Sequence, residues 1–227
     1  MSSSGRPEPP PGVGGPTLSE VLGSRGGALD ASVPPLAFVV GYALGAGPDA
    51  VTWGAGAAVA AGVLVAAVRL ARGKRPTAVV LGVLGVVAAA LVALGTGRAV
   101  DFFLLQLAGN AASALVWTVS IAVRWPLLGV IVGLALGQRT RWRRDPDLLR
   151  GYRRASWVWV AQYAVRLAVF VPLYLAEQVS LLAVARGALT YPLVAACVVL
   201  SWFVPRRALP DGHPGLLHPA DPDRRDP

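Results

Sequence analysis

An arginine inside an apolar stretch is the residue of this sequence whose position most plainly suggests chemistry. Arg166 lies near the middle of the run 157–175, in which most other residues are apolar or aromatic. A helix of about 20 residues crosses the roughly 30 Å hydrocarbon core of a membrane, because each residue adds about 1.5 Å. An ionisable side chain at that depth costs on the order of 3 kcal/mol or more unless it is paired or hydrated. Arg166 is therefore a candidate functional residue.

Amide side chains occupy positions that we expect to lie beside Arg166. Gln162 precedes it by one helical turn, and Gln106 and Asn110 are one turn apart in the apolar run 102–123. Helical rise places Asn110 and Arg166 at similar depths, and a guanidinium has five donors and no acceptor. We predict that Arg166 donates to one of these three amides. Two interpretations of this polar group remain open: helix packing or snorkelling of Arg166, and a site for an anion or a lipid headgroup.

The sequence does not offer the residues that most catalytic and metal sites need. The apolar runs contain no histidine and no carboxylate, and the chain has no glycine-rich phosphate loop. His213 and His218 lie in a proline-rich tail without further ligands, and the single cysteine, Cys197, can form no intrachain disulfide. We therefore predict a protein that is not an enzyme, with no catalytic residues, no metal and no cofactor.

The composition indicates a membrane protein. Of the 227 residues, 55% are hydrophobic and the mean hydropathy is +0.57, whereas soluble domains are about 45 to 50% apolar even when glycine is included. We predict an all-α, polytopic membrane helix bundle within residues 33–204, between disordered cytoplasmic tails at 1–32 and 205–227. Six transmembrane helices are expected, at 33–47, 53–70, 77–95, 102–123, 157–175 and 187–203.

The basic residues predict the orientation of these helices. The net charge is +9, and Lys and Arg cluster between the apolar runs, as in cytoplasmic loops that meet anionic headgroups. A crossing by the short apolar run 125–137 would place the following arginines outside, so we predict a short interfacial or re-entrant helix there and cytoplasmic N and C termini. No motif for nucleic-acid binding accompanies the charge. The basic residues expected to face lipid are Arg72, Lys74, Arg75, Arg141, Arg143, Arg144, Arg153 and Arg154.

Three further patterns predict local contacts. The spacing of Gly41 and Gly45 lets helix backbones approach closely. Arg98 and Asp101 are spaced to pair across a turn at the outer face. Trp142 and Tyr152 are aromatic residues among arginines, which is typical of anchors at the headgroup level.

Five motifs together resemble those of a known family. They are Val33-Pro-Pro-Leu-Ala-Phe, Gly97-Arg-Ala-Val-Asp-Phe-Phe103, Arg124-Trp-Pro-Leu-Leu-Gly-Val-Ile-Val-Gly133, Trp142-Arg-Arg-Asp-Pro146 and Pro172-Leu-Tyr-Leu175. As a set, over residues 22–204, they resemble the domain of unknown function 3159 family of actinobacterial integral membrane proteins. The layout also resembles intracellular septation protein A, a bacterial inner-membrane protein linked to division and envelope synthesis. The first resemblance implies a multi-pass protein of the bacterial plasma membrane and carries no established catalytic residues.

Two functions fit these observations. The first is a non-enzymatic membrane scaffold or interaction protein, linked to the cell envelope or division, with membrane proteins as partners. The alternative is a small transporter or channel subunit with a site around Arg166 and Asn110. A solvated cavity that reaches Arg166 from one face would favour the transporter, and a dry, closed bundle would favour the scaffold.

Overall fold

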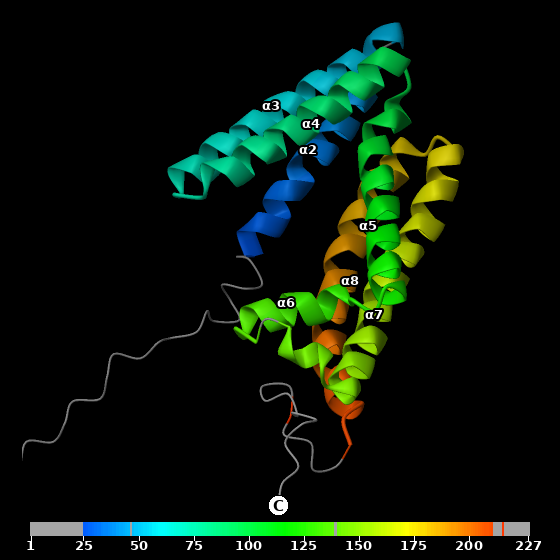
Figure 1. The fold of residues 1–227 in the computed structure, drawn as a ribbon. Helices are drawn as coiled ribbons and strands as arrows, with labels where there is room; N and C mark the ends of the chain where they lie inside the picture. The colour runs from blue at the N-terminus through cyan, green and yellow to red at the C-terminus, as the bar shows by residue number, and fades with distance from the viewer. Residues whose placement is uncertain (1–24, 46, 139, 211–214, 216–227) are drawn as a thin grey trace, which may run out of the picture.

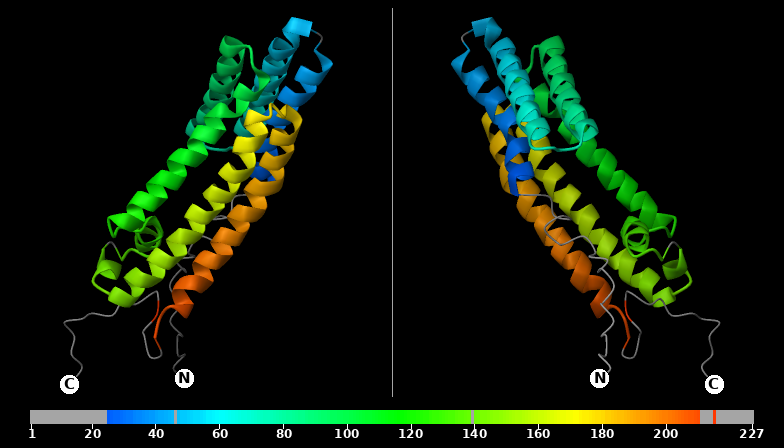
Figure 2. Two further views of the ribbon diagram at one scale, coloured as in Figure 1. Left: turned by 90° about the vertical axis from the view of Figure 1, so that its right-hand side faces the viewer. Right: turned by 90° about the vertical axis from the view of Figure 1, so that its left-hand side faces the viewer.

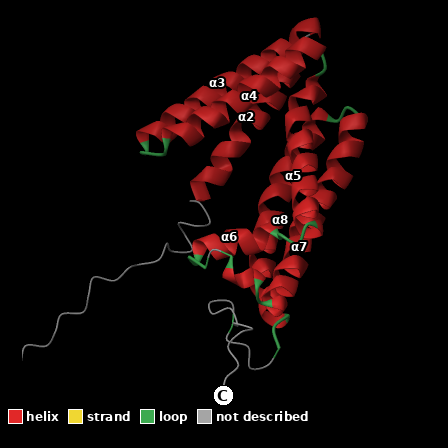
Figure 3. Ribbon diagram, in the orientation of Figure 1, coloured by secondary structure: helices red, strands yellow, loops and turns green. Residues whose placement is uncertain are grey.

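The computed structural model describes residues 25–45, 47–138, 140–210 and 215, and all regular structure in these ranges is helical (Figure 3). Three short 3-10 helices, η1 (Gly47–Asp49), η2 (Ala99–Phe103) and η3 (Arg141–Arg143), connect or precede longer elements. The α-helices of the described residues are α2 (Arg25–Leu44), α3 (Ala50–Ala71), α4 (Pro76–Thr96), α5 (Leu104–Ala122), α6 (Leu127–Ala135), α7 (Pro146–Leu175) and α8 (Val179–Arg207). The predicted all-α class is confirmed for the described residues.

Within the described part of the chain, five helices are long and apolar enough to cross a membrane. They are Gly47–Ala71, Pro76–Thr96, Ala99–Ala122, Pro146–Leu175 and Val179–Arg207. They correspond to five of the six predicted transmembrane segments. In α2 the apolar part is Asp30–Leu44, which is shorter and spans about 22 Å at 1.5 Å per residue, so the sixth span stays a prediction.

Several predicted boundaries are wrong: polar or small residues continue α2 and α7 beyond their apolar parts, and α8 begins earlier, within the apolar run 179–185. Helix α2 begins at Arg25, inside the predicted tail 1–32, and α7 begins at Pro146 rather than at 157. The start of α7 is fixed by Asp145, whose carboxylate accepts hydrogen bonds from the backbone N–H groups of the next turn, as a helix N-cap does. Helix α8 begins at Val179 rather than at 187 and extends into the predicted tail 205–227. The rest of the first tail, residues 1–24, lies outside the described residues.

Helix α6 has the length expected of a segment that does not cross the membrane. Its nine residues span about 13 Å, well short of the roughly 30 Å hydrocarbon core. It lies across the ends of α7 and α8 rather than alongside them (Figure 1). We call this end of the molecule the α6 end and the opposite one, where α7 meets α8, the far end.

The helices form two groups that diverge toward the α6 end (Figures 1 and 2). Helices α2, α3 and α4 lean away from α5, α7 and α8, while a continuous hydrophobic core joins the two groups at the far end. Phe38 of α2 stacks on Phe102 with ring centroids 4.1 Å apart, and Phe103 completes this aromatic cluster. The groups are thus fixed together at one end and separate toward the other.

The predicted close approach at Gly41 is confirmed. A Cβ atom on Gly41 would lie 2.6 Å from the carbonyl oxygen of Trp53, and one on Gly54 would lie 3.0 Å from that of Phe38. Only glycine therefore fits at these positions of the interface between α2 and α3 without a shift of the backbone.

The predicted role of Trp142 and Tyr152 as lipid anchors is wrong. Trp142 is fully buried and Tyr152 is 1% exposed, and their rings meet edge to face within a second core at the α6 end. Trp142 also contacts the backbone of α6, because a Cβ atom on Gly129 would lie 2.8 Å from its ring. These aromatic residues hold α6 against α7 and do not reach the lipid.

Candidate functional site

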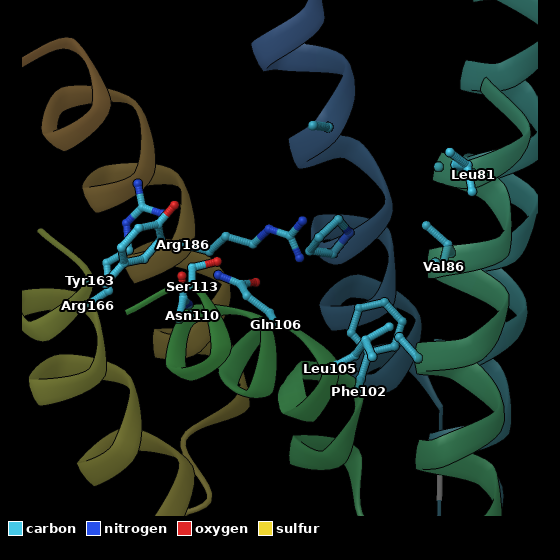
Figure 4. A pocket seen from close by; sticks show the side chains of 16 residues that line it. Leu81, Val86, Phe102, Leu105, Gln106, Asn110, Ser113, Tyr163, Arg166 and Arg186 are labelled. Atoms are coloured by element: carbon cyan, nitrogen blue, oxygen red, sulfur yellow. The ribbon is translucent and has the colours of Figure 1, made fainter. Parts of the chain in front are cut away.

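A cavity of about 490 Å³ lies where the two helix groups separate. Its walls come from α2, α4, η2, α5, α7 and α8. Apolar and small residues make up most of the lining, including Pro35, Val86, Ala89 and Phe102. The polar residues that line it are Gln106, Asn110, Ser113, Tyr163, Arg166 and Arg186 (Figure 4). The cavity therefore brings together Arg166 with two of the three amides predicted to lie beside it.

Arg166 is held by a backbone carbonyl rather than by an amide side chain. It is 7% exposed, and its Nη2 donates to the carbonyl oxygen of Thr190 on α8 at 3.0 Å. Its guanidinium also lies 5.6 Å from the ring centroid of Tyr163, one turn away on α7. The prediction that Arg166 donates to Gln106, Asn110 or Gln162 is wrong, because the neighbouring helix α8 offers a carbonyl oxygen with a second lone pair.

Some residues that line the cavity carry a buried polar atom without a hydrogen-bond partner among the described residues. These atoms are Nε of Arg166, Oε1 of Gln106 and Nδ2 of Asn110. Asn110 is 6% exposed, and a buried donor without a partner costs about 1–3 kcal/mol. A ligand or water would remove that cost if it offered acceptors to Nε of Arg166 and Nδ2 of Asn110 and a donor to Oε1 of Gln106.

Gln162 does not belong to the cavity. It is 3% exposed and neither its amide nitrogen nor its oxygen has a partner among the described residues. It does not line the space that Arg166 faces. Its predicted place in the site is therefore not supported by the arrangement of side chains.

Arg186 is a functional candidate that the sequence reasoning missed. It lies just before the predicted span 187–203, but α8 begins at Val179, which places Arg186 about 10 Å into the helix, close to the roughly 14 Å that separate Arg166 from Leu175. Figure 4 shows its side chain directed into the space faced by Gln106, Asn110 and Ser113. The apolar run before Arg186, Val179-Ser-Leu-Leu-Ala-Val-Ala, is the signal that could have revealed it.

A smaller cavity of about 170 Å³ adjoins the first and shares Arg186 with it. Asp30 and Arg69 also line this space, and they form an ion pair with 3.2 Å between Oδ2 and Nε. The carboxylate closest in position to the cavities is therefore already paired with a different arginine. Among the described residues, no acidic side chain lines the larger cavity.

The predicted pair of Arg98 and Asp101 is part of a wider network at the far end. Arg98 lies 3.8 Å from Asp101 and 2.9 Å from Glu177, and the hydroxyl of Tyr174 donates to the buried carboxylate of Asp101. The hydrogen bond that Arg98 donates to Glu177 and the nearby charge of Asp101 raise the pKa of Arg98 above its usual value. The network ties the connection after α4 to the end of α7.

The predicted lipid-facing basic residues lie on the surface, with one exception. Arg72, Lys74, Arg75, Arg141, Arg143, Arg144 and Arg154 are exposed, whereas Arg153 is half-buried. Arg143 lies over the exposed ring of Trp125, 4.0 Å from its centroid. Among the described residues, no group of His, Cys, Asp and Glu side chains could hold a metal ion.

These features define a multi-pass membrane protein with a polar, arginine-bearing cavity between two groups of helices. The chain belongs to the family described as Protein of unknown function (DUF3159), whose model matches residues 22–211. No curated protein matches the chain. No solved structure matches it either.

Proposed function

We propose that this protein is a small membrane transporter or channel subunit that binds an anionic group in the cavity between its two helix groups. One observation carries the proposal: Arg166 and Arg186 line the same cavity, and no acidic residue of the described chain lines it with them. The volume of about 490 Å³ lies within the range of about 300–1,000 Å³ that is usual for small-molecule sites.

The energetics favour a ligand that carries negative charge. Two guanidinium groups at this depth are costly without compensation, and Arg166 has a single hydrogen bond for its five donors. An anion supplies both the opposite charge and acceptors, and charge-assisted hydrogen bonds are roughly twice as strong as neutral ones. The amides of Gln106 and Asn110 and the hydroxyl of Ser113 add further polar groups to the same space.

The scaffold interpretation stays a prediction, as do its links to the cell envelope or division and to membrane-protein partners. A scaffold has no need of a polar cavity, so the polar cavity at Arg166 supports the transporter proposal. We keep the proposals that the protein is not an enzyme and needs no cofactor, and that it does not bind nucleic acid. The resemblances to actinobacterial membrane proteins and to septation protein A support a location in a bacterial plasma membrane.

We further propose six transmembrane helices, with α2 as the first and with the α6 end in the cytoplasm. The connections α2–α3, α4–α5 and α7–α8 all lie toward the far end, and the α3–α4 connection lies on the other side (Figure 1). Exposed Lys and Arg residues occupy the α3–α4 connection and the segment before α7. Such an excess of positive charge is typical of cytoplasmic loops that contact anionic lipid.

The test of anion binding uses the full-length protein in a mild detergent and measures its unfolding temperature by tryptophan fluorescence. The probes are glycerol 3-phosphate and oleoyl lysophosphatidic acid, which share a phosphate monoester, and oleoylglycerol, which lacks it. A ligand at 100 times its Kd stabilises by about 2.7 kcal/mol, enough to raise the unfolding temperature measurably. We expect at least one phosphate probe to do so and oleoylglycerol to have no comparable effect.

Variants connect this stabilisation to the cavity. Arg166→Gln and Arg186→Gln should remove the effect of the phosphate probe, whereas Arg72→Gln, which changes an exposed surface arginine, should retain it. The proposal is wrong if neither phosphate probe stabilises the wild-type protein, or if the three variants lose the effect equally.

A further inference from the structure

Two sides of the cavity differ in polarity and in exposure. On the side of α2 and α8 the two helices are joined by a hydrogen bond between the hydroxyls of Ser32 and Tyr191, which lie 3.2 Å apart. Between α4 and α5 the cavity is lined by Leu81, which is 69% exposed, and by Leu105, which is 48% exposed. The α4–α5 side therefore has an apolar, exposed rim.

Glycines widen this rim. Gly82 and Gly85 on α4 and Gly109 on α5 all line the cavity. A Cβ atom on any of the three would meet no other atom within 4 Å. The space beside the glycines is thus open rather than filled by a neighbouring helix, unlike the tight contact at Gly41.

The position of the rim decides what can occupy it. Leu81 and Leu105 belong to helices that are candidate membrane spans, so their exposed side chains face hydrocarbon rather than water. In a bilayer, acyl chains rather than water would occupy the apolar rim of such a gap, because the leucine side chains there offer water no hydrogen-bond partner. The arginines, amides and hydroxyl lie deeper in the cavity, beyond this apolar rim (Figure 4).

We propose that the ligand of this cavity is an anionic amphiphile, whose phosphate-type head contacts Arg166 and Arg186 and whose acyl chain extends into the bilayer between α4 and α5. The proposal rests on the proposed function and names its substrate class. The polar interior matches the head, and the rim of leucine and glycine matches the chain. A free phosphate compound from the cytoplasm shares the head chemistry, and it is the alternative that the experiment distinguishes.

The decisive experiment fills the rim without touching the arginines. Gly85→Leu and Gly109→Leu place a large side chain in open space on either helix, and both changes favour helix formation. The matched control is Gly95→Leu, because Gly95 is also on α4, has nothing within 4 Å of a Cβ and does not line the cavity. The Kd values of oleoyl lysophosphatidic acid and glycerol 3-phosphate are measured for each variant.

We expect the wild-type protein to bind lysophosphatidic acid at least tenfold more tightly than glycerol 3-phosphate. Gly85→Leu or Gly109→Leu should raise the Kd of lysophosphatidic acid at least tenfold, whereas Gly95→Leu should leave this Kd unchanged. If glycerol 3-phosphate binds as tightly as lysophosphatidic acid, and Gly85→Leu and Gly109→Leu change neither Kd, the amphiphile proposal is overturned and anion binding stands. If neither phosphate compound binds in an arginine-dependent way, both proposals fail.

Discussion

Replacing Arg166 with methionine separates a ligand site from a structural role, because the two roles predict different changes in stability. The variant loses the hydrogen bond to Thr190, which is worth about 1.5–3 kcal/mol for a charged group. It also loses the cation–π contact with Tyr163, worth about 0.5–1 kcal/mol. These losses are the stabilising contributions of the side chain that the structure shows.

The same substitution also removes two destabilising contributions. A charge within the membrane costs on the order of 3 kcal/mol, and the partnerless Nε of Arg166 costs about 1–3 kcal/mol more. The destabilising contributions that the substitution removes are at least as large as the stabilising ones that it loses, so we expect Arg166→Met not to lower the free energy of unfolding. Replacing buried charges by apolar residues of similar volume is often neutral or stabilising.

Unfolding of the variant is followed by tryptophan fluorescence in detergent, in parallel with binding of the phosphate probes. We expect stability no lower than that of the wild type, together with loss of binding. A destabilisation of 3–5 kcal/mol, which is typical of breaking a required buried pair, would refute this reasoning and assign Arg166 a structural role. Arg166→Lys serves as the companion variant, because it keeps the charge but loses the geometry of the guanidinium.

Two further predictions concern the fold. Gly41→Leu should destabilise the protein by about 1–3 kcal/mol, because the new side chain would collide with the carbonyl of Trp53. The control Gly56→Leu should have little effect, because the space beside Gly56 is open. Thermal unfolding of the two variants tests this difference. Cysteines introduced at the exposed positions Arg72 and Arg144 should react with an impermeant maleimide only after cells are opened, and labelling of either in intact cells would contradict the cytoplasmic assignment of the α6 end.

The membrane helices could be found from the sequence because the signal for them is local. Apolar runs of about 20 residues are sufficient to indicate spans, and five of the six predicted segments meet the length and composition criteria in the structure. The ends of α7 and α8 could not be found in the same way. Residues 146–156 are mostly polar or small, yet they continue α7 from the cap at Asp145, and hydropathy does not distinguish such a helix from a loop.

The candidate site was predicted in part, because depth along a helix can be counted whereas rotation between helices cannot. Helical rise correctly grouped Arg166 with Asn110 and Gln106 at one level of the bundle. It could not tell that Gln162 faces elsewhere or that Thr190 supplies the acceptor. Arg186 was missed because an error in the start of α8 moved it to the wrong depth.

The arrangement of the helix groups gives the cavity a defined direction of opening. At the far end one buried core includes Phe38, Phe102 and Phe170, so residues of both groups pack together there. On one flank α2 contacts α8 through Ser32 and Tyr191. Because the groups are joined at the far end and along this flank, a change in the angle between them would widen or narrow the α4–α5 side most. The glycine-lined rim therefore lies where such a movement would have its largest effect on a bound acyl chain.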